Sequence, residues 1–311
     1  MMQSPENRDI VVAALKHAAP YIRMYKHKIF VLKAGGEVFS SLQSTRKVVE
    51  QVAILHQVGI RVVLVHGGGP QSTQLADALG VTTQFVEGRR ITDESSLEVA
   101  AMVLNGQINT RILAACRDFD LSAIGISGVD AGLIRAHKRP PVKLEGNDLE
   151  SVDYGFVGDI ESVDADILRT QLDAGLVPVV SPLSADKKGT LLNINADTVA
   201  AALASALGAE KLILATGAPG ILEDHLDAAS LVSYIDLAGL QRLRESGALV
   251  DGMLPKAAAI EAAITGGVPR VHIISMKLPD SLLLEVFTNE GTGTLVIENI
   301  DTLSAEEQNR G

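Results

Sequence analysis

Two lysines stand beside glycines where a strand or a helix meets a turn. Lys33 ends the apolar run Ile29–Lys33 and is followed by Gly35-Gly36, and Lys256 falls in the first turn of a predicted helix that begins near Pro255. A buried lysine is costly unless it faces a cleft, and the helix dipole disfavours a cation in the first turn. Both positions therefore favour anion binding. A strand end that leaves the core, or a solvated lysine, is the alternative explanation.

The strongest single signal is the turn His66-Gly67-Gly68-Gly69-Pro70. It joins the aliphatic run Arg61–Val65 to a predicted helix over Pro70–Leu79, with proline in the first turn. Unpaired backbone N–H groups at a helix N-terminus attract a carboxylate or a phosphate. A tight structural turn needs one glycine, so three favour a ligand site. His66 is interpreted as structural.

Other polar residues near predicted helix starts are candidate ligands. Arg90, which follows Gly88-Arg89, could clamp a carboxylate through two donors, although a solvated surface arginine is the alternative. Asn193 has no evident structural role, whereas Asn195 is the expected N-cap of the next helix. Asp197 lies in the first turn of that helix, where a carboxylate complements the dipole.

These residues require a scaffold that brings several strand ends together. Apolar runs alternate with helical patterns, which predicts a mainly parallel sheet with helices on both faces and ligands at the carboxyl ends of the strands. Asp93–Arg117 is predicted as one long helix. Leu133–His137 and Asp153–Gly158 are predicted as the strands of a hairpin. The other predicted strands are Ile29–Lys33, Arg61–Val65, Ser122–Ile126, Leu176–Ser181, Lys211–Ala215, Arg270–Ile274 and Thr294–Ile297.

Composition excludes several classes of protein. The chain has 311 residues, of which 47% are hydrophobic, so a disordered chain is excluded. The net charge of −11 argues against nucleic acid or an anionic membrane as a partner. The single Cys116 excludes an internal disulfide framework and indicates a reducing, cytoplasmic location. The sequence has no Walker A loop, no GxGxxG and no HExxH.

The segment before the first strand is distinct. Ile10–Ala19 has apolar residues at helical spacing, Pro20 is expected to end or kink this helix, and Tyr21–Tyr25 resumes it. The helix either packs on its own domain or forms an exposed arm that pairs with another subunit.

Six segments taken together resemble the amino acid kinase family. In chain order they are FVLKAGG, VLVHGGGPQ, GRRITDESSLEVAAMVLNGQIN, GISGVDAG, NINADTVAAALA and GMLPKAAAIEAA, and the resemblance runs from about Ile10 to Ile297. It is greatest to members that phosphorylate the side-chain carboxylate of N-acetyl-L-glutamate with MgATP, the second step of arginine biosynthesis. It implies a three-layer αβα sandwich with an N-terminal arm (1–27), an amino-acid-substrate lobe (28–185) and a nucleotide-binding lobe (186–311).

The resemblance also assigns roles to individual residues. Lys33 and Lys256 would stabilise the transferring phosphoryl group, with Asp197 holding both lysines. The acceptor carboxylate is already ionised at pH 7, so no general base is required. Gly36 and Gly69 would donate amides to the phosphoryl group, and Gly68, Gly69, Arg90 and Asn193 would bind acetylglutamate, with Arg90 on its α-carboxylate. The implied nucleotide-binding residues are Lys33, Gly35, Thr216, Gly217, Gly220 and Lys256. The magnesium ion would be held by the ATP phosphates rather than by protein side chains.

Regulation and assembly are implied in the same way. Tyr21, His272 and Glu285 stand where arginine-inhibited members hold the effector, and Ala14–Tyr25 resembles the kinked arm that interlaces dimers into a hexamer. A homodimer or a hexamer is therefore expected.

Three positions depart from the family pattern, and two alternative functions follow. They are Glu37, Arg89 and Ser275-Met276-Lys277, the last placed near the proposed effector site. One alternative is a related kinase that acts on a succinylglutamate or aminoadipate derivative. The other is a non-catalytic homologue that senses arginine or binds a nitrogen-sensing regulatory protein.

Overall fold

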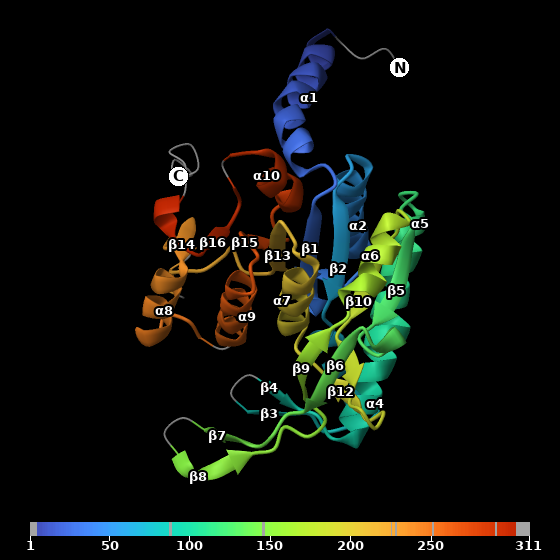
Figure 1. Ribbon diagram of the computed structural model, residues 1–311, viewed down its shortest axis with the longest axis vertical. Coiled ribbons are helices and arrows are strands. Elements are labelled where there is room, and N and C mark those ends of the chain that lie inside the picture. The colour runs from blue at the N-terminus through green and yellow to red at the C-terminus, as the bar shows by residue number, and fades with distance from the viewer. Residues whose placement is uncertain are drawn as a thin grey trace.

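An eight-stranded sheet crosses the centre of the computed structural model, which describes residues 5–86, 89–144, 147–224, 226–227, 229–250, 252–289 and 291–302 (Figure 1). The strand order is β14-β16-β15-β13-β1-β2-β10-β5, and every neighbouring pair is parallel except β15–β16. The mainly parallel sheet is therefore confirmed. Its strands are β1 (Ile29–Ala34), β2 (Arg61–His66), β5 (Ala123–Ser127), β10 (Val177–Ser181), β13 (Lys211–Thr216), β14 (Tyr234–Asp236), β15 (Val271–Ser275) and β16 (Thr294–Ile297).

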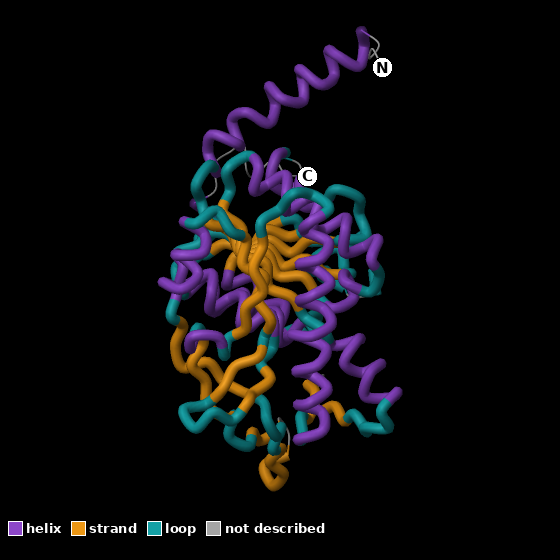
Figure 2. The backbone as a smooth tube through the Cα atoms, turned by 90° about the vertical axis from the view of Figure 1, so that its right-hand side faces the viewer, coloured by secondary structure: helices purple, strands orange, loops and turns teal. Residues whose placement is uncertain are grey.

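Helices cover both faces of this sheet, as Figure 2 shows with the strands between them. Alternate residues of β1 point to opposite faces, so Val31 packs with one apolar core, and Phe30 and Leu32 pack with the other. The first core includes α6 (Ala165–Asp173), α7 (Ala196–Leu207), α8 (Leu237–Glu245) and α9 (Met253–Thr265). The second includes α2 (Leu42–Gln57), α5 (Thr110–Arg117) and α10 (Ser281–Phe287). The three-layer αβα sandwich is confirmed.

Smaller sheets lie below the central one in Figure 1. One strand of the predicted hairpin is confirmed as β6 (Ile134–Lys138). Its antiparallel partner is β9 (Gly158–Val163) and not the predicted strand Asp153–Gly158. A separate two-stranded ribbon, β7 (Val142–Leu144) with β8 (Asn147–Val152), occupies the chain between them. The other strands are β3 (Gln84–Val86), β4 (Arg89–Ile91), β11 (Leu183–Ala185) and β12 (Leu191–Asn193).

The long helix predicted over Asp93–Arg117 is helical throughout but not uniform. It comprises α4 (Glu94–Ala101), a π-helical segment (Met102–Asn109) and α5. Asp93 is its N-cap and accepts a hydrogen bond from the backbone of Ser96 at 2.8 Å. π-Helical turns are wider than α-helical ones and are frequent at functional sites, so this segment is a candidate for a functional role.

The N-terminal helix α1 (Pro5–Tyr25) projects from one end of the body (Figure 1). It continues through Pro20, so the helix does not end there. Ile10 and Leu15 are 65% and 62% exposed on it. None of the helices in the described ranges is long and apolar enough to cross a membrane.

Short helical elements complete the chain. The helix α3 (Gly69–Ala78) follows β2 directly, and three 3₁₀ turns cover Gly36–Phe39, Asp130–Gly132 and Ile300–Thr302. Because β1 and β2 run in register, with Ala34 opposite His66, the turn after β1 and the turn before α3 leave the same edge of the sheet side by side.

Candidate active site

Three buried charged side chains meet at this edge of the sheet. Lys33 Nζ lies 2.9 Å from Asp197 Oδ1, and Lys256 Nζ lies 3.1 Å from Asp197 Oδ2. The three side chains are only 9–10% exposed. Lys33 comes from the end of β1, whereas Asp197 and Lys256 come from the first turns of α7 and α9. The fold thus brings together three residues that the sequence places far apart.

The electrostatics of this cluster keep Asp197 ionised. Burial on its own would raise the pKa of Asp197, but the charges of Lys33 and Lys256 hold that pKa below its ordinary value. The pKa of Lys256 is lowered by burial and by repulsion from Lys33, while Asp197 and Glu37 oppose the shift. Asp197 is therefore the partner that offsets the unfavourable cation at the start of α9. With both lysines protonated, the cluster carries one excess positive charge.

Two glycine turns approach each other beside the cluster. The Gly67 N–H donates to Ala34 O at 2.9 Å. A Cβ on Gly36 would lie 2.6 Å from Gln71 Oε1 and 3.0 Å from the Cα of Gly68, so only glycine permits this approach. Nothing lies within 4 Å of a Cβ built on Gly69, the first residue of α3. The turns form the amide-rich wall that the sequence predicts.

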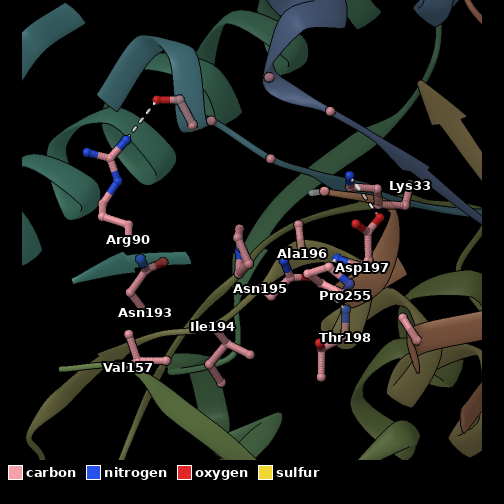
Figure 3. A pocket seen from close by; sticks show the side chains of 18 of the residues that line it. Lys33, Arg90, Val157, Asn193, Ile194, Asn195, Ala196, Asp197, Thr198 and Pro255 are labelled. Atoms are coloured by element: carbon pink, nitrogen blue, oxygen red, sulfur yellow. Dashed lines mark hydrogen bonds and ion pairs between the residues drawn. The ribbon is translucent and has the colours of Figure 1, made fainter. Parts of the chain in front are cut away.

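A cavity of about 770 Å³ opens from the cluster, which is a size suited to small-molecule substrates. Figure 3 shows Lys33 and Asp197 on one side of it and Arg90 and Asn193 on the other, with Ile194 between. Its apolar lining residues include Phe85, Ala100, Leu104, Val157, Ile160 and Ile194.

Arg90 anchors the far end of the cavity. Its guanidinium donates to Thr83 Oγ1 at 3.1 Å, to Thr73 Oγ1 at 2.7 Å and to Gly69 O at 3.2 Å, and it lies 4.9 Å from the ring centre of Phe85. These three acceptors are uncharged. They orient the arginine without forming an ion pair with it. Burial lowers the pKa of Arg90 and the charge of Asp77 opposes this shift, so the guanidinium stays charged and can bind an anionic group of a ligand.

The two asparagines near α7 divide as the sequence predicts. Asn195 caps α7, because its Oδ1 accepts from the backbone N–H of Asp197 at 2.8 Å and of Thr198 at 3.2 Å. Asn193 lines the cavity from the end of β12, and its side-chain amide donates a long hydrogen bond, 3.4 Å, to Thr92 Oγ1. Its amide is thus placed to contact a ligand.

The residues assigned to the nucleotide separate into two groups. Lys33 and Gly35 line the cavity, and so do Gly252 and Pro255 just before Lys256. The cavity lining does not include Lys256, Thr216, Gly217 or Gly220. A Cβ on Gly220 would lie 2.6 Å from Thr294 Oγ1, so this glycine is required for packing. A Cβ on Gly217 would lie 3.9 Å from Glu37 Cγ and 3.7 Å from Lys277 Cε. Gly217 therefore lies beside the cavity, next to a residue of its rim.

Two of the positions that depart from the family pattern, Glu37 and Lys277, fall on this nucleotide side. The Glu37 carboxylate lies over Gly35, where a Cβ would be 2.3 Å from its oxygens, and Glu37 lines the cavity. Lys277 lies next to Gly217 rather than beside the predicted effector residues. Gly88 and the side chain of Arg89 lie outside the described residues.

Two lining residues had no signal in the sequence. Arg139 donates from Nε and Nη2 to Asp159 Oδ1 at 2.9 and 2.6 Å. Tyr154, 3% exposed, precedes β9 and also reaches the cavity. Both come from the segments around the misassigned hairpin, so only the correct strand pairing could have placed them.

The described residues include no cluster of three or more His, Cys, Asp or Glu side chains that could hold a metal ion. Both oxygens of Asp197 already accept from lysines. Whether protein side chains contribute to a metal site stays at the level of the sequence prediction.

The predicted effector residues lie at the opposite edge of the central sheet. His272 Nδ1 lies 2.5 Å from Glu285 Oε1, and His272 Nε2 lies 3.2 Å from Lys211 Nζ. His272 and Lys211 stand at the amino-terminal ends of β15 and β13. Tyr21 donates to Asn289 Oδ1 at 2.5 Å, just after α10. The fold gathers these side chains near the base of α1.

The structure combines a three-layer αβα sandwich with two lysines that share one carboxylate at the carboxyl ends of parallel strands. Comparison with known proteins identifies the family to which this chain belongs. The amino acid kinase family model matches residues 28–275, so the chain belongs to the amino acid kinase family. The resemblance predicted from the six segments is confirmed.

Named relatives cover almost the whole chain. An acetylglutamate kinase of Myxococcus xanthus is 48% identical over 92% of this chain and 94% of its own length. An acetylglutamate kinase of Methanococcoides burtonii is 42% identical over the same shares. Among solved structures, the N-acetylglutamate synthase of Neisseria gonorrhoeae, complexed with coenzyme A and N-acetyl-glutamate, superposes with a TM-score of 0.80 at 30% identity. The match covers 93% of this chain but only 63% of that synthase chain.

Proposed function

We propose that this chain transfers the γ-phosphoryl group of ATP to the side-chain carboxylate of N-acetyl-L-glutamate, forming an acyl phosphate in arginine biosynthesis. The observation that carries the proposal is one cavity with Lys33 and Asp197 at one end, where Asp197 also pairs with Lys256, and the guanidinium of Arg90 at the other. The acetylglutamate kinases that match nearly the full chain support the same substrate.

The geometry suits attack by a carboxylate on a phosphoryl group. The acceptor carboxylate is ionised at pH 7, so the reaction needs no general base. It needs relief from the repulsion between a carboxylate and a polyphosphate, through positioning and cationic contacts. At about 4 Å and an effective dielectric constant of about 20, each lysine–phosphoryl contact is worth about 4 kcal/mol before desolvation. Lys33 and Lys256 supply two such contacts, and the amides of Gly36 and Gly69 add hydrogen bonds.

The binding roles follow from the two ends of the cavity. Arg90 binds the α-carboxylate, while Gly68 and Asn193 bind the remaining polar groups of acetylglutamate. ATP approaches from the side of Gly35 and Gly217. Magnesium, if bound to the ATP phosphates, would neutralise charge there, and the exposed Glu37 lies on that side. The amino-acid lobe then corresponds to residues 28–185 and the nucleotide lobe to residues 186–311.

Trapping the acyl phosphate with hydroxylamine tests this proposal. N-acetyl-L-glutamate, N-succinyl-L-glutamate, L-glutamate and an aminoadipate derivative are each incubated with the enzyme, MgATP and hydroxylamine. We expect hydroxamate with N-acetyl-L-glutamate and at least tenfold less with the others. Greater turnover of the succinyl or aminoadipate substrate would replace the proposed substrate, and no hydroxamate with any of them would favour a non-catalytic role.

We propose further that L-arginine binds near the base of α1. The buried groups of Lys211, His272 and Glu285 meet there, and Tyr21 reaches the same region from α1. A second structure of the Neisseria synthase, complexed with coenzyme A and L-arginine, superposes with a TM-score of 0.77 at 28% identity over 93% of this chain and 65% of that one. We expect L-arginine, but not D-arginine or L-lysine, to raise the melting temperature and reduce turnover. Turnover indifferent to L-arginine would contradict the proposal.

The exposed apolar side chains of α1 support a homo-oligomer joined through this helix. Ile10, Leu15 and Met24 are more than half exposed on a helix that projects from the body. Light scattering should give a dimer or a hexamer, and Leu15→Asp should shift the chain to a smaller species. Lys16→Asp, on the neighbouring position of the same helix, is the matched control. An unchanged mass for the Leu15 variant would exclude α1 from the interface.

A further inference from the structure

A chain of buried hydrogen bonds lies beneath the second glycine turn. Asn109, in the π-helical segment, donates from Nδ2 to Val179 O at 2.9 Å and contacts His66 Nε2 at 3.2 Å. His66 Nδ1 contacts Gly67 O at 3.2 Å. His66 is fully buried and Asn109 is 6% exposed. None of these contacts belongs to the proposed phosphoryl-transfer cluster.

The donor and the acceptor of each hydrogen bond in this series follow from the backbone carbonyl of Val179, where the series begins. A backbone carbonyl only accepts, so the Asn109 group facing Val179 must be its NH₂. That NH₂ also faces His66 Nε2, which must therefore accept and carry no proton. In a neutral imidazole the proton then lies on Nδ1, which donates to Gly67 O. Burial lowers the pKa of His66 to about 4, so the ring is neutral at pH 7.

The last bond of this chain fixes the peptide between Gly67 and Gly68. The peptide is planar and trans, so a carbonyl held toward the buried ring directs the following N–H away from it. That N–H belongs to Gly68, which lines the cavity. Within the described part of the chain, the Gly68 N–H has no acceptor. It is a free donor beside the site proposed for the acceptor substrate.

The packing around the turn is consistent with this function. A Cβ on Gly68 would lie 2.7 Å from Ile108 Cδ1 and from Leu104 Cδ2, so the π-helical segment presses directly on the turn. A Cβ on Gly125 would lie 2.1 Å from Asn109 Oδ1, so the asparagine oxygen needs a glycine beside it. The wide helical segment thus places an amide under the turn and apolar side chains against it.

We propose that Asn109 and His66 are positioning residues: Asn109 fixes the Nδ1–H tautomer of His66, which orients the Gly68 amide toward the substrate. The kinetic consequence rests on the function proposed above, whereas the tautomer does not. Without the Asn109–His66 contact, the peptide between Gly67 and Gly68 can rotate. The hydrogen bond from the Gly68 N–H to a carboxylate of the substrate is then weakened, which corresponds to about a tenfold change in substrate binding.

Nitrogen NMR of ¹⁵N-histidine-labelled, full-length wild-type protein tests the tautomer without any turnover. We expect the His66 signals, assigned by their loss in His66→Asn, to show a protonated Nδ1 and a bare Nε2 at pH 7. A protonated Nε2 at pH 7 would overturn the proposal whether or not the chain phosphorylates N-acetyl-L-glutamate.

Steady-state kinetics test the consequence, with Asn109→Leu as the variant and Asn105→Leu as its matched control. Asn105 lies in the same π-helical segment and accepts from Ser181 instead of contacting His66. We expect Asn109→Leu to raise KM for N-acetyl-L-glutamate about tenfold, with kcat and the KM for ATP changed less than threefold, and Asn105→Leu to leave all three near wild type. An equal rise of KM in both variants, or an unchanged KM in Asn109→Leu, would contradict the positioning role. If Asn109→Leu fails to fold, the NMR measurement on the wild type still decides.

Discussion

Replacing the shared carboxylate of the cluster is the most informative perturbation, because Asp197 touches both lysines. Asp197→Asn keeps the size of the side chain and removes its charge. Two buried ammonium groups, each about 3 Å from the carboxylate, are left without their counter-charge. At that separation and an effective dielectric constant of about 20, each attraction is worth about 5 kcal/mol before desolvation.

The net effect is smaller than this sum and has two expected parts. Removing one partner from a buried ion pair costs about 3–5 kcal/mol of stability, unless the remaining charge is released. Burial already lowers the pKa of Lys256, and loss of the Asp197 charge lowers it further, so a smaller fraction of this lysine stays protonated in the variant. The variant then lacks one phosphoryl-binding cation, and turnover should fall by about 100-fold.

The pH profile of hydroxamate formation is the decisive assay. Since the lost cation returns when Lys256 is protonated, kcat of Asp197→Asn should rise as the pH is lowered, whereas kcat of the wild type should not. Asp173→Asn is the matched control, since this carboxylate pairs with Arg61 at the surface and is 63% exposed. It should change stability by less than about 1 kcal/mol. Wild-type stability together with a wild-type pH profile in Asp197→Asn would refute the electrostatic reasoning.

Three further predictions follow from the same geometry. Lys33→Ala or Lys256→Ala should reduce kcat by about 100-fold or more with little change in far-UV circular dichroism, and near-normal turnover would remove the lysine from the mechanism. Arg90→Lys should raise KM for N-acetyl-L-glutamate about tenfold at unchanged KM for ATP, because a lysine cannot make the paired contacts of the fork; equal changes in both KM values would contradict this. For His66, the native pKa of about 4 lies below the ordinary 6.5, so the unfolded chain binds the proton first as the pH falls. Stability should therefore decline by about 3 kcal/mol between pH 6.5 and pH 4, and urea titrations should show this component missing in His66→Asn.

Local patterns predicted the central sheet because its strands are buried on both faces. The run Arg61–Val65 is aliphatic after its first residue and is followed by a turn and a helix, and alternation of this kind leaves few topologies open. The N-caps Asp93 and Asn195 were also predictable, since a cap depends on residues within one turn.

Predictions failed where a distant contact overrides a local pattern. The partner of β6 lies beyond the β7–β8 ribbon, because strand pairing is decided by the register of two distant segments. The place of Glu37 and Lys277 beside Gly217 depends on how β1, β13 and β15 lie side by side, which no local signal records.

The sequence by itself determined which residues we propose to carry the chemistry, since a lysine at a strand end or a helix start is unfavourable without a negative partner. The tertiary structure decided how they act together. Lys33, Asp197 and Lys256 belong to three elements separated by up to 223 positions, and only the packing of α7 and α9 on β1 brings their charges within about 3 Å. Direct electrostatic coupling at this strength requires contact distance and burial, and both are properties of the fold.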